Sequence, residues 1–452
     1  MSVHKLLDPI LDQGLLHTNF FEGRLLSAQD LRDQQDANRE RGRRLGRALG
    51  SGIVDGLEVV LESDGADGQP PVVTVKAGLA INAEGEIIGL PKHDVQVALA
   101  RSIVASPTTE ADFYACVGPP TTKHLPNGVG VYVLVMSPAA GYKDRAPMSG
   151  LGDAGVVKGC GSRYVSEGVR FRLIEPPIVD AVEQPDVAAD ALLRELLTGP
   201  EPPTRDNPQR LSLLRNLIAH RLFASEDLRA AFADLLNAPF GFQAASGGAV
   251  LAGRTVPAGL DDCDVPLALL YWTFAGVQFL DLWAVRRTLQ ARAIQGGGPY
   301  GLCLPPAAAD ARLRQFHAQL HELVDAQITP ANVKVREHFR WLPPLGVVPI
   351  VGNGVTDGVD IDRFFDGLTV STPIYVEGGE VARMLADSLF GPVVDAAGAE
   401  LVWRYVVREN IQASSTTGPG RAAPVALFAS PALPLYGESR YNAKYWNFGN
   451  YR

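Results

Sequence analysis

Arginines are concentrated near the start of the chain in a pattern that could serve phosphate binding. Five of them stand within nine residues: Arg39, Arg41, Arg43, Arg44 and Arg47. Guanidinium groups recognise phosphate, so a nucleic-acid site is one interpretation of this cluster. Acidic residues occupy the first part of the same segment, however, and this order suits the helix dipole and i,i+4 ion pairs. The pattern favours a solvated or subunit-facing helix.

Metal binding has two weak candidates. His317 and His321 have the four-residue spacing that can bind zinc on a helix, but a third ligand and the HExxH order are missing. Three aspartates could bind a cation, although they lack the spacing of an EF-hand loop; they are Asp261, Asp262 and Asp264. Packed or exposed side chains are the preferred interpretation, and neither a metal nor a cofactor is predicted.

Covalent catalysis has no sequence signature here. The segments around Ser149 and Ser246 do not match the G-x-S-x-G elbow of serine hydrolases. Paired carboxylates for glycoside cleavage stay open, because any Asp or Glu could serve. The sequence therefore predicts no catalytic residue, and we expect the chain not to be an enzyme.

The composition is that of a globular protein. The chain has 452 residues, 46% hydrophobic and 20% charged, a length that predicts two to four domains. Its net charge of −9 argues against nucleic-acid binding by the protein as a whole. We expect no signal peptide, and no stretch reaches the roughly 18 apolar residues of a membrane span. Four scattered cysteines predict free, buried thiols in a reducing compartment.

A helix over residues 28–49 must carry the arginines. Ser27 and Asp30 resemble a capping box, and the glycines at 50 and 52 predict the end of the helix. Gly42, Gly46 and Gly50 recur every four residues on one face. Since each glycine costs a helix roughly 0.5–1 kcal/mol against alanine, this face predicts the close approach of another backbone.

The remaining pattern predicts a multidomain α+β chain, β-rich, with antiparallel meanders or sandwich-like sheets, an N-terminal helix and a central helical region. Strands are expected over 53–62, 72–75, 79–82, 129–137, 162–177 and 399–411, with a three-residue hairpin turn at 83–85. Helical periodicity covers 191–197, 211–223, 225–237 and 305–330. The predicted divisions are an N-terminal segment and basic helix (1–52), a β-rich domain (53–178), a mainly helical domain (179–345), a C-terminal α/β or β domain (346–411) and an extended aromatic arm (412–452).

The opening 100 residues resemble baseplate-region proteins of phage-tail-like contractile injection systems. The resemblance rests on an aromatic pair, a "leucine-serine-alanine-x-aspartate-leucine" helix entry, a basic helix, and a "Gly-Leu-x-Val" strand. In this chain these are Phe20, Phe21, Leu26 to Leu31, Arg41 to Arg47, and Gly56 to Val59. The following VVTVKAGLAINAEGEIIGLP is similar to a hairpin of tail and fibre proteins, with Ala77 in place of the usual proline and Asn82 in place of aspartate.

The resemblance implies a structural subunit near the baseplate of such a particle, a virion-like component assembled in a bacterial cytoplasm. Its expected partners are other tail or baseplate subunits and further copies of itself in three- or six-fold symmetry, with no nucleic acid and no membrane span. Large aromatic and arginine side chains favour interfaces. The predicted interface residues are Phe20, Phe21, Arg39, Arg43, Arg44, Arg47, Tyr441, Tyr445, Trp446, Phe448 and Tyr451. A tail-associated hydrolase and a glycan- or receptor-binding module are the alternatives.

Overall fold

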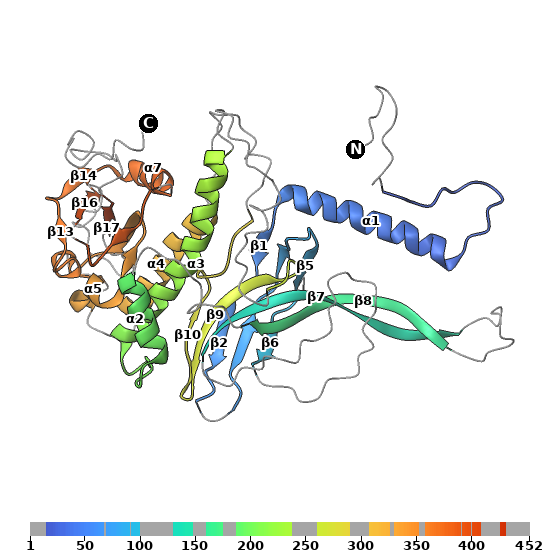
Figure 1. The fold of residues 1–452 in the computed structure, drawn as a ribbon, viewed down its shortest axis with the longest axis horizontal. Helices are drawn as coiled ribbons and strands as arrows, with labels where there is room; N and C mark the ends of the chain where they lie inside the picture. The colour runs from blue at the N-terminus through green and yellow to red at the C-terminus, as the bar shows by residue number, and fades with distance from the viewer. Residues whose placement is uncertain are drawn as a thin grey trace, which may run out of the picture.

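The structure is a computed structural model. It describes residues 15–66, 69–90, 92–99, 130–147, 160–174, 187–236, 260–289, 307–325, 330–351, 358–389, 391–398, 400–407 and 425–430. These residues form a β-rich α+β fold with seven α-helices and mostly antiparallel strands, as the sequence predicts (Figure 1). The layers run from helix α1 (Ala28–Leu49) and a β-meander, through a central sheet and central helices, to a C-terminal body.

Six short strands form the N-terminal meander. In chain order they are β1 (Gly52–Gly56), β2 (Val59–Ser63), β3 (Val72–Val75), β4 (Gly78–Ile81), β5 (Ile87–Leu90) and β6 (Val95–Ala98). Gly56 and Leu57 between β1 and β2 both have positive φ, so the strand predicted over 53–62 is divided there. The six strands pair as two sheets, β1-β4-β5 and β2-β3-β6. The predicted hairpin turn is confirmed, with Gly85 at φ +82°.

The central sheet has the order β10-β9-β7-β8. Its strands are β7 (Gly130–Pro147), β8 (Cys160–Ile174), β9 (Val265–Thr273) and β10 (Gly276–Asp281). Because β9 pairs with β7 only as far as Met136, the outer parts of β7 and β8 continue alone as a two-stranded ribbon. This ribbon projects in the same direction as α1 (Figure 1).

Alternation of side chains along β7 gives the central sheet two buried faces. Leu134 and Met136 point to the meander, whereas Val133 and Val135 point to the helices. The central helices are α2 (Val187–Thr198), α3 (Pro208–Leu236) and α4 (Ala307–Asp325). Helix α3 is continuous where two helices were predicted, because no glycine or proline separates 211–223 from 225–237.

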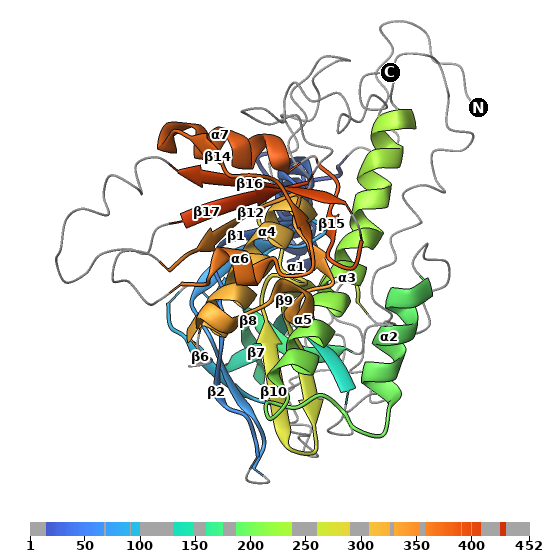
Figure 2. The same ribbon diagram turned by 90° about the vertical axis from the view of Figure 1, so that its left-hand side faces the viewer.

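The C-terminal body is built on a mixed sheet of order β12-β17-β16-β13, with β14 also paired to β16. Its elements are a 3₁₀ turn (Pro330–Asn332), α5 (Val335–His338), β11 (Trp341–Leu342), β12 (Leu345–Pro349), α6 (Ile361–Phe364), β13 (Thr369–Val370), β14 (Ile374–Val376), α7 (Gly378–Ser388), β15 (Val394–Asp395), β16 (Leu401–Val407) and β17 (Val425–Ala429). Helix α4 covers one face of this sheet, where its Phe316 packs against Phe428 of β17. Helix α7 covers the other face through Met384 (Figure 2). Strands β13 and β14 run parallel to β16.

Two of the predicted divisions are crossed by sheets. Strands β9 and β10 follow the helices α2 and α3 in sequence, yet they belong to the same sheet as β7 and β8. Strand β17 lies within the segment expected to be an extended arm, and it is a buried central strand. The prediction of free thiols is wrong for Cys263, which is disulfide-bonded.

Candidate interaction surface

Hydrogen bonds between Ser27 and Asp30 determine where α1 begins. The Ser27 side chain accepts a hydrogen bond from the backbone N–H of Asp30, and the Asp30 carboxylate accepts from the backbone of Ser27. The Ser27 hydroxyl also donates a hydrogen bond to the Asp30 carboxylate. This bond and the one from the Ser27 backbone lower the pKa of Asp30, and the Arg24 guanidinium adds to the effect. The capping box predicted from the sequence is therefore confirmed, with Asp in the position usually held by Glu.

The middle of α1 rests on the β4–β5 hairpin of its own chain. A Cβ added to Gly46 would lie 2.1 Å from the carbonyl oxygen of Gly85, and one added to Gly85 would lie 2.2 Å from that of Arg43. The predicted close approach of a second backbone is thus confirmed at Gly46. Gly42, by contrast, faces open space, since its added Cβ would meet no atom within 4 Å.

The predicted arginines all have carboxylate partners. Arg43 binds Glu86 on β5, with Nε 2.9 Å from Oε1, and Arg39 reaches Glu167 on the ribbon at 3.4 Å.

The other two predicted arginines, Arg44 and Arg47, share Glu40 at 3.2 and 2.7 Å. Burial raises the pKa of Glu40, yet the hydrogen bonds from both arginines outweigh it and lower the pKa. Arg44 and Arg47 therefore form ion pairs within α1, as the acid-then-base order in the sequence suggests, whereas Arg39 and Arg43 connect the helix to other elements.

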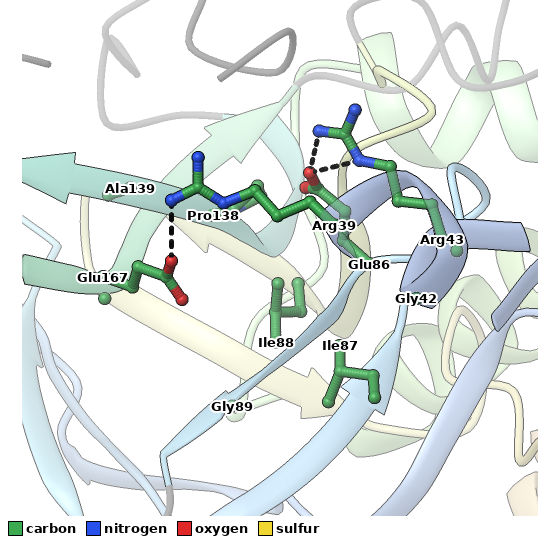
Figure 3. A pocket seen from close by; sticks show the side chains of 12 residues that line it. Arg39, Gly42, Arg43, Glu86, Ile87, Ile88, Gly89, Pro138, Ala139 and Glu167 are labelled. Atoms are coloured by element: carbon green, nitrogen blue, oxygen red, sulfur yellow. Dashed lines mark hydrogen bonds and ion pairs between the residues drawn. The ribbon is translucent and has the colours of Figure 1, made fainter. Parts of the chain in front are cut away.

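A groove of about 360 Å³ opens between α1, β5 and the ribbon (Figure 3). Its walls are formed by Arg39 and Gly42 on α1 and by Glu167 on β8, and Ile87 and Ile88 lie at its base. The Ile87 side chain is 64% exposed. No pattern in the sequence indicated this groove, because its walls come from three segments that are distant in the chain.

Large apolar side chains are exposed along the N-terminal segment and α1. Phe20 and Phe21 are 52% and 63% exposed, and Arg24 lies over the Phe21 ring. Leu31, Leu45 and Leu49 of α1 are 52%, 66% and 41% exposed. Of the eighteen large hydrophobic residues that are exposed in the described part of the chain, eight lie between residues 16 and 49.

The predicted interface residues thus divide into two groups. Phe20, Phe21 and the four arginines lie on one continuous N-terminal element. The aromatic residues of the C-terminal segment lie outside the described residues, so their part of the prediction stays a prediction; they are Tyr441, Tyr445, Trp446, Phe448 and Tyr451.

The two histidines of the possible zinc site have different surroundings. Burial lowers the pKa of His317 from 6.5 to about 4, and its Nε2 accepts a hydrogen bond from the Val347 N–H. His321 is largely exposed and lies 3.1 Å from Asp325. Within the part of the chain that the structure describes, no three metal-ligating side chains gather. The preferred interpretation from the sequence, packed and exposed side chains, describes this pair.

The aspartates beside Cys263 also have protein partners. The buried Asp264 carboxylate accepts hydrogen bonds from the Ser137 hydroxyl, the Arg172 guanidinium and the backbone N–H of Asp261. These bonds join the loop before β9 to both β7 and β8. Asp264 therefore has a structural explanation that needs no cation.

A second buried ion pair joins the central helices to the central sheet. The Arg215 side chain on α3 is 5% exposed, and it binds Asp281 at the end of β10 and Glu322 on α4. Burial disfavours the charge of Arg215, but the two carboxylates outweigh it and raise the pKa of the guanidinium. Gln315 donates a further bond to Asp281. This cluster fixes the helices to the sheet.

The chain matches no protein-family model and no curated protein. Every helix in the described ranges is too short or too polar to cross a membrane.

Proposed function

We propose that this chain is a structural subunit of a contractile, phage-tail-like injection particle, placed near its baseplate. It acts by oligomerisation and by docking to neighbouring subunits, and it carries out no chemistry. The N-terminal segment and α1 supply the docking surface.

One observation carries the proposal: a projecting helix that leaves three leucines exposed to solvent, close to two exposed phenylalanines that precede it. Monomeric proteins rarely expose contiguous apolar patches, and larger ones mark interaction sites. Leu31 and Leu49 are eighteen positions apart, which is five helical turns, so they lie on the same side of α1. The arginines beside them are already paired with carboxylates, which leaves the leucines as the unsatisfied part of the surface.

The N-terminal resemblance gives the class of assembly. Phe20, Phe21 and the helix entry at Ser27 are the residues that carry it, and they lie on the same exposed element. An element that both resembles baseplate proteins and exposes apolar side chains is well suited to subunit docking.

The test is electron cryo-microscopy of the intact particle, prepared with the wild-type protein and with the triple variant Leu31→Gln, Leu45→Gln and Leu49→Gln. We expect the wild type to occupy ordered positions that contact neighbours through residues 20–50, and the triple variant to be missing from them. The control is Arg383→Gln on α7, an exposed change far from α1 in sequence, which should leave occupancy unchanged. A particle that is complete without this protein would refute the proposal.

A further inference from the structure

Strand β5 is an open edge of the sheet β1-β4-β5. Within the described residues it pairs with β4 alone, so its other side has no strand beside it. The Asn82 N–H binds the carbonyl oxygen of Glu86 at 3.0 Å, which sets the phase of the ladder between β4 and β5. Because bonded and non-bonded pairs alternate in an antiparallel ladder, the N–H and C=O groups of Ile87 and Gly89 point away from β4.

The open edge of β5 borders the groove between α1, β5 and the ribbon (Figure 3). All residues of the segment 85–89 line this groove, whereas one face of a strand would present only every second residue. The segment spans about 13 Å, at roughly 3.3 Å per residue. On the α1 wall, Gly42 leaves room beside the edge, since a Cβ added there would meet no atom within 4 Å.

Two other edge strands of these sheets are covered by their own chain. At β1, the opposite edge of the same sheet, the Ile53 N–H binds the Arg287 carbonyl and the Leu289 N–H binds the Ile53 carbonyl, each at 2.9 Å. At β10, the edge of the central sheet, the Arg205 guanidinium donates hydrogen bonds to two backbone carbonyl oxygens. The described part of the chain places no such cover on β5.

The chemistry of the groove suits an uncharged, extended segment. Edge strands are commonly protected by lysine, proline or an inward-pointing charge, and the β5 sequence Ile-Ile-Gly-Leu has none of these. The Ile87 side chain is exposed. The charged groups that line the groove are paired with each other, Arg43 with Glu86 and Arg39 with Glu167. What the groove offers a partner is therefore an apolar side chain and outward-pointing backbone groups.

We infer that a short, uncharged, extended segment of a different subunit lies in this groove and adds a strand to β5. In strand addition, main-chain hydrogen bonds give the affinity and alternate side chains give the specificity. Helix α1 and the ribbon both project past β5, so a slender segment can reach the edge, whereas the folded sheet of a second copy cannot (Figure 1). This inference rests on the docking role proposed above and adds a second contact to it.

The test measures amide hydrogen exchange at single-residue resolution, in the isolated full chain and in the intact particle. In the isolated chain the amides of Ile87 and Gly89 should exchange at least about tenfold faster than those of Ile88 and Leu90, which face β4, after correction for intrinsic rates. In the particle the Ile87 and Gly89 amides should slow by at least about tenfold. Electron cryo-microscopy should show an extended segment of a neighbour about 4.8 Å from β5.

Variants at two positions separate strand addition from other causes of protection. Ile87→Pro removes one outward N–H and leaves the hydrogen bonds to β4 in place, so the Gly89 amide should lose its protection in the particle. Ile87→Val is the matched control, since it keeps the amide and the apolar side chain, and it should keep the protection. Gly42→Leu places a side chain on the α1 wall of the groove and should also abolish the protection, which provides a test even if Ile87→Pro does not fold.

Three outcomes overturn the inference. Protection of Ile87 and Gly89 in the isolated monomer would assign the edge to a segment of the same chain. Density from a second copy beside β5 would assign it to that copy, and fast exchange of both amides in the particle would leave the edge empty. If the subunit contacts its neighbours through residues 20–50 while the edge stays exposed, this inference fails and the proposed function stands. A particle that is complete without this protein refutes both.

Discussion

The contact between α1 and the β4–β5 hairpin yields a sharp prediction, because two glycines four residues apart on α1 should respond oppositely to the same substitution. Gly46→Ala puts a methyl group 2.1 Å from the carbonyl oxygen of Gly85, where real contacts require about 3.5 Å. The helix must therefore move off the hairpin. Overpacking of this kind costs roughly 3 kcal/mol, and the better helix propensity of alanine returns about 1 kcal/mol. The net loss is about 2 kcal/mol.

Gly42→Ala is the matched control. Its methyl group enters open space, so only the helix propensity changes, and the variant should be more stable by about 1 kcal/mol. Hydrogen exchange read by mass spectrometry reports on α1 and on the hairpin turn directly. Exchange in residues 28–49 and 82–86 should be about thirtyfold faster in Gly46→Ala and several-fold slower in Gly42→Ala.

The exchange measurement should be made at a protein concentration where the chain is monomeric, so that contacts between copies contribute nothing. If the two variants shift in the same direction, or if Gly46→Ala exchanges like the wild type, then α1 does not rest on the hairpin as described. The ion pair between Arg43 and Glu86 would then lose its geometric basis as well.

Three further changes test the interior, each by urea unfolding of the full chain. Burial holds the pKa of His317 near 4 in the folded protein, against about 6.5 in the unfolded chain. The unfolded chain therefore binds a proton first as the pH falls. This should lower the free energy of unfolding by about 2 kcal/mol between pH 7 and pH 5. His317→Gln should flatten that pH dependence by this amount and the exposed His321→Gln should not; equal slopes in both would contradict the burial argument. Asp264→Ala removes three hydrogen-bond acceptor contacts from a buried site and should cost about 3 kcal/mol, so a loss below about 1 kcal/mol would count against its structural role. Arg215→Met leaves the carboxylate of Asp281 buried without its cation and should cost roughly 3–5 kcal/mol; a loss below about 1 kcal/mol would count against this charge pairing.

Features governed by neighbours in the sequence were predictable. Ser27 and Asp30 place the beginning of α1, because a capping box needs only residues three positions apart. Gly85 identifies the β4–β5 turn, because a three-residue hairpin needs one residue with positive φ. The period of the glycines on α1 also predicted a close backbone contact, which the structure has at Gly46.

Features governed by distant segments were not predictable. Nothing near Val265 in the sequence indicates that β9 pairs with β7, and nothing near Val425 indicates that β17 lies between β12 and β16. Strand order depends on which surfaces can be buried together, and that choice is made over the whole chain. The divisions predicted at 178 and 411 followed changes in local pattern, and local pattern carries no information about pairing across them.

The surface of α1 combines both kinds of information. The sequence by itself determined that residues 28–49 form a helix, that acids precede bases along it, and that glycines recur every four residues on one face. Only the tertiary structure decided which side of that helix meets the hairpin and which stays in solvent, because exposure depends on where Gly85, Glu86 and Glu167 come to lie. Leucines on one side of a helix belong to the core when the chain covers them and remain exposed when it does not.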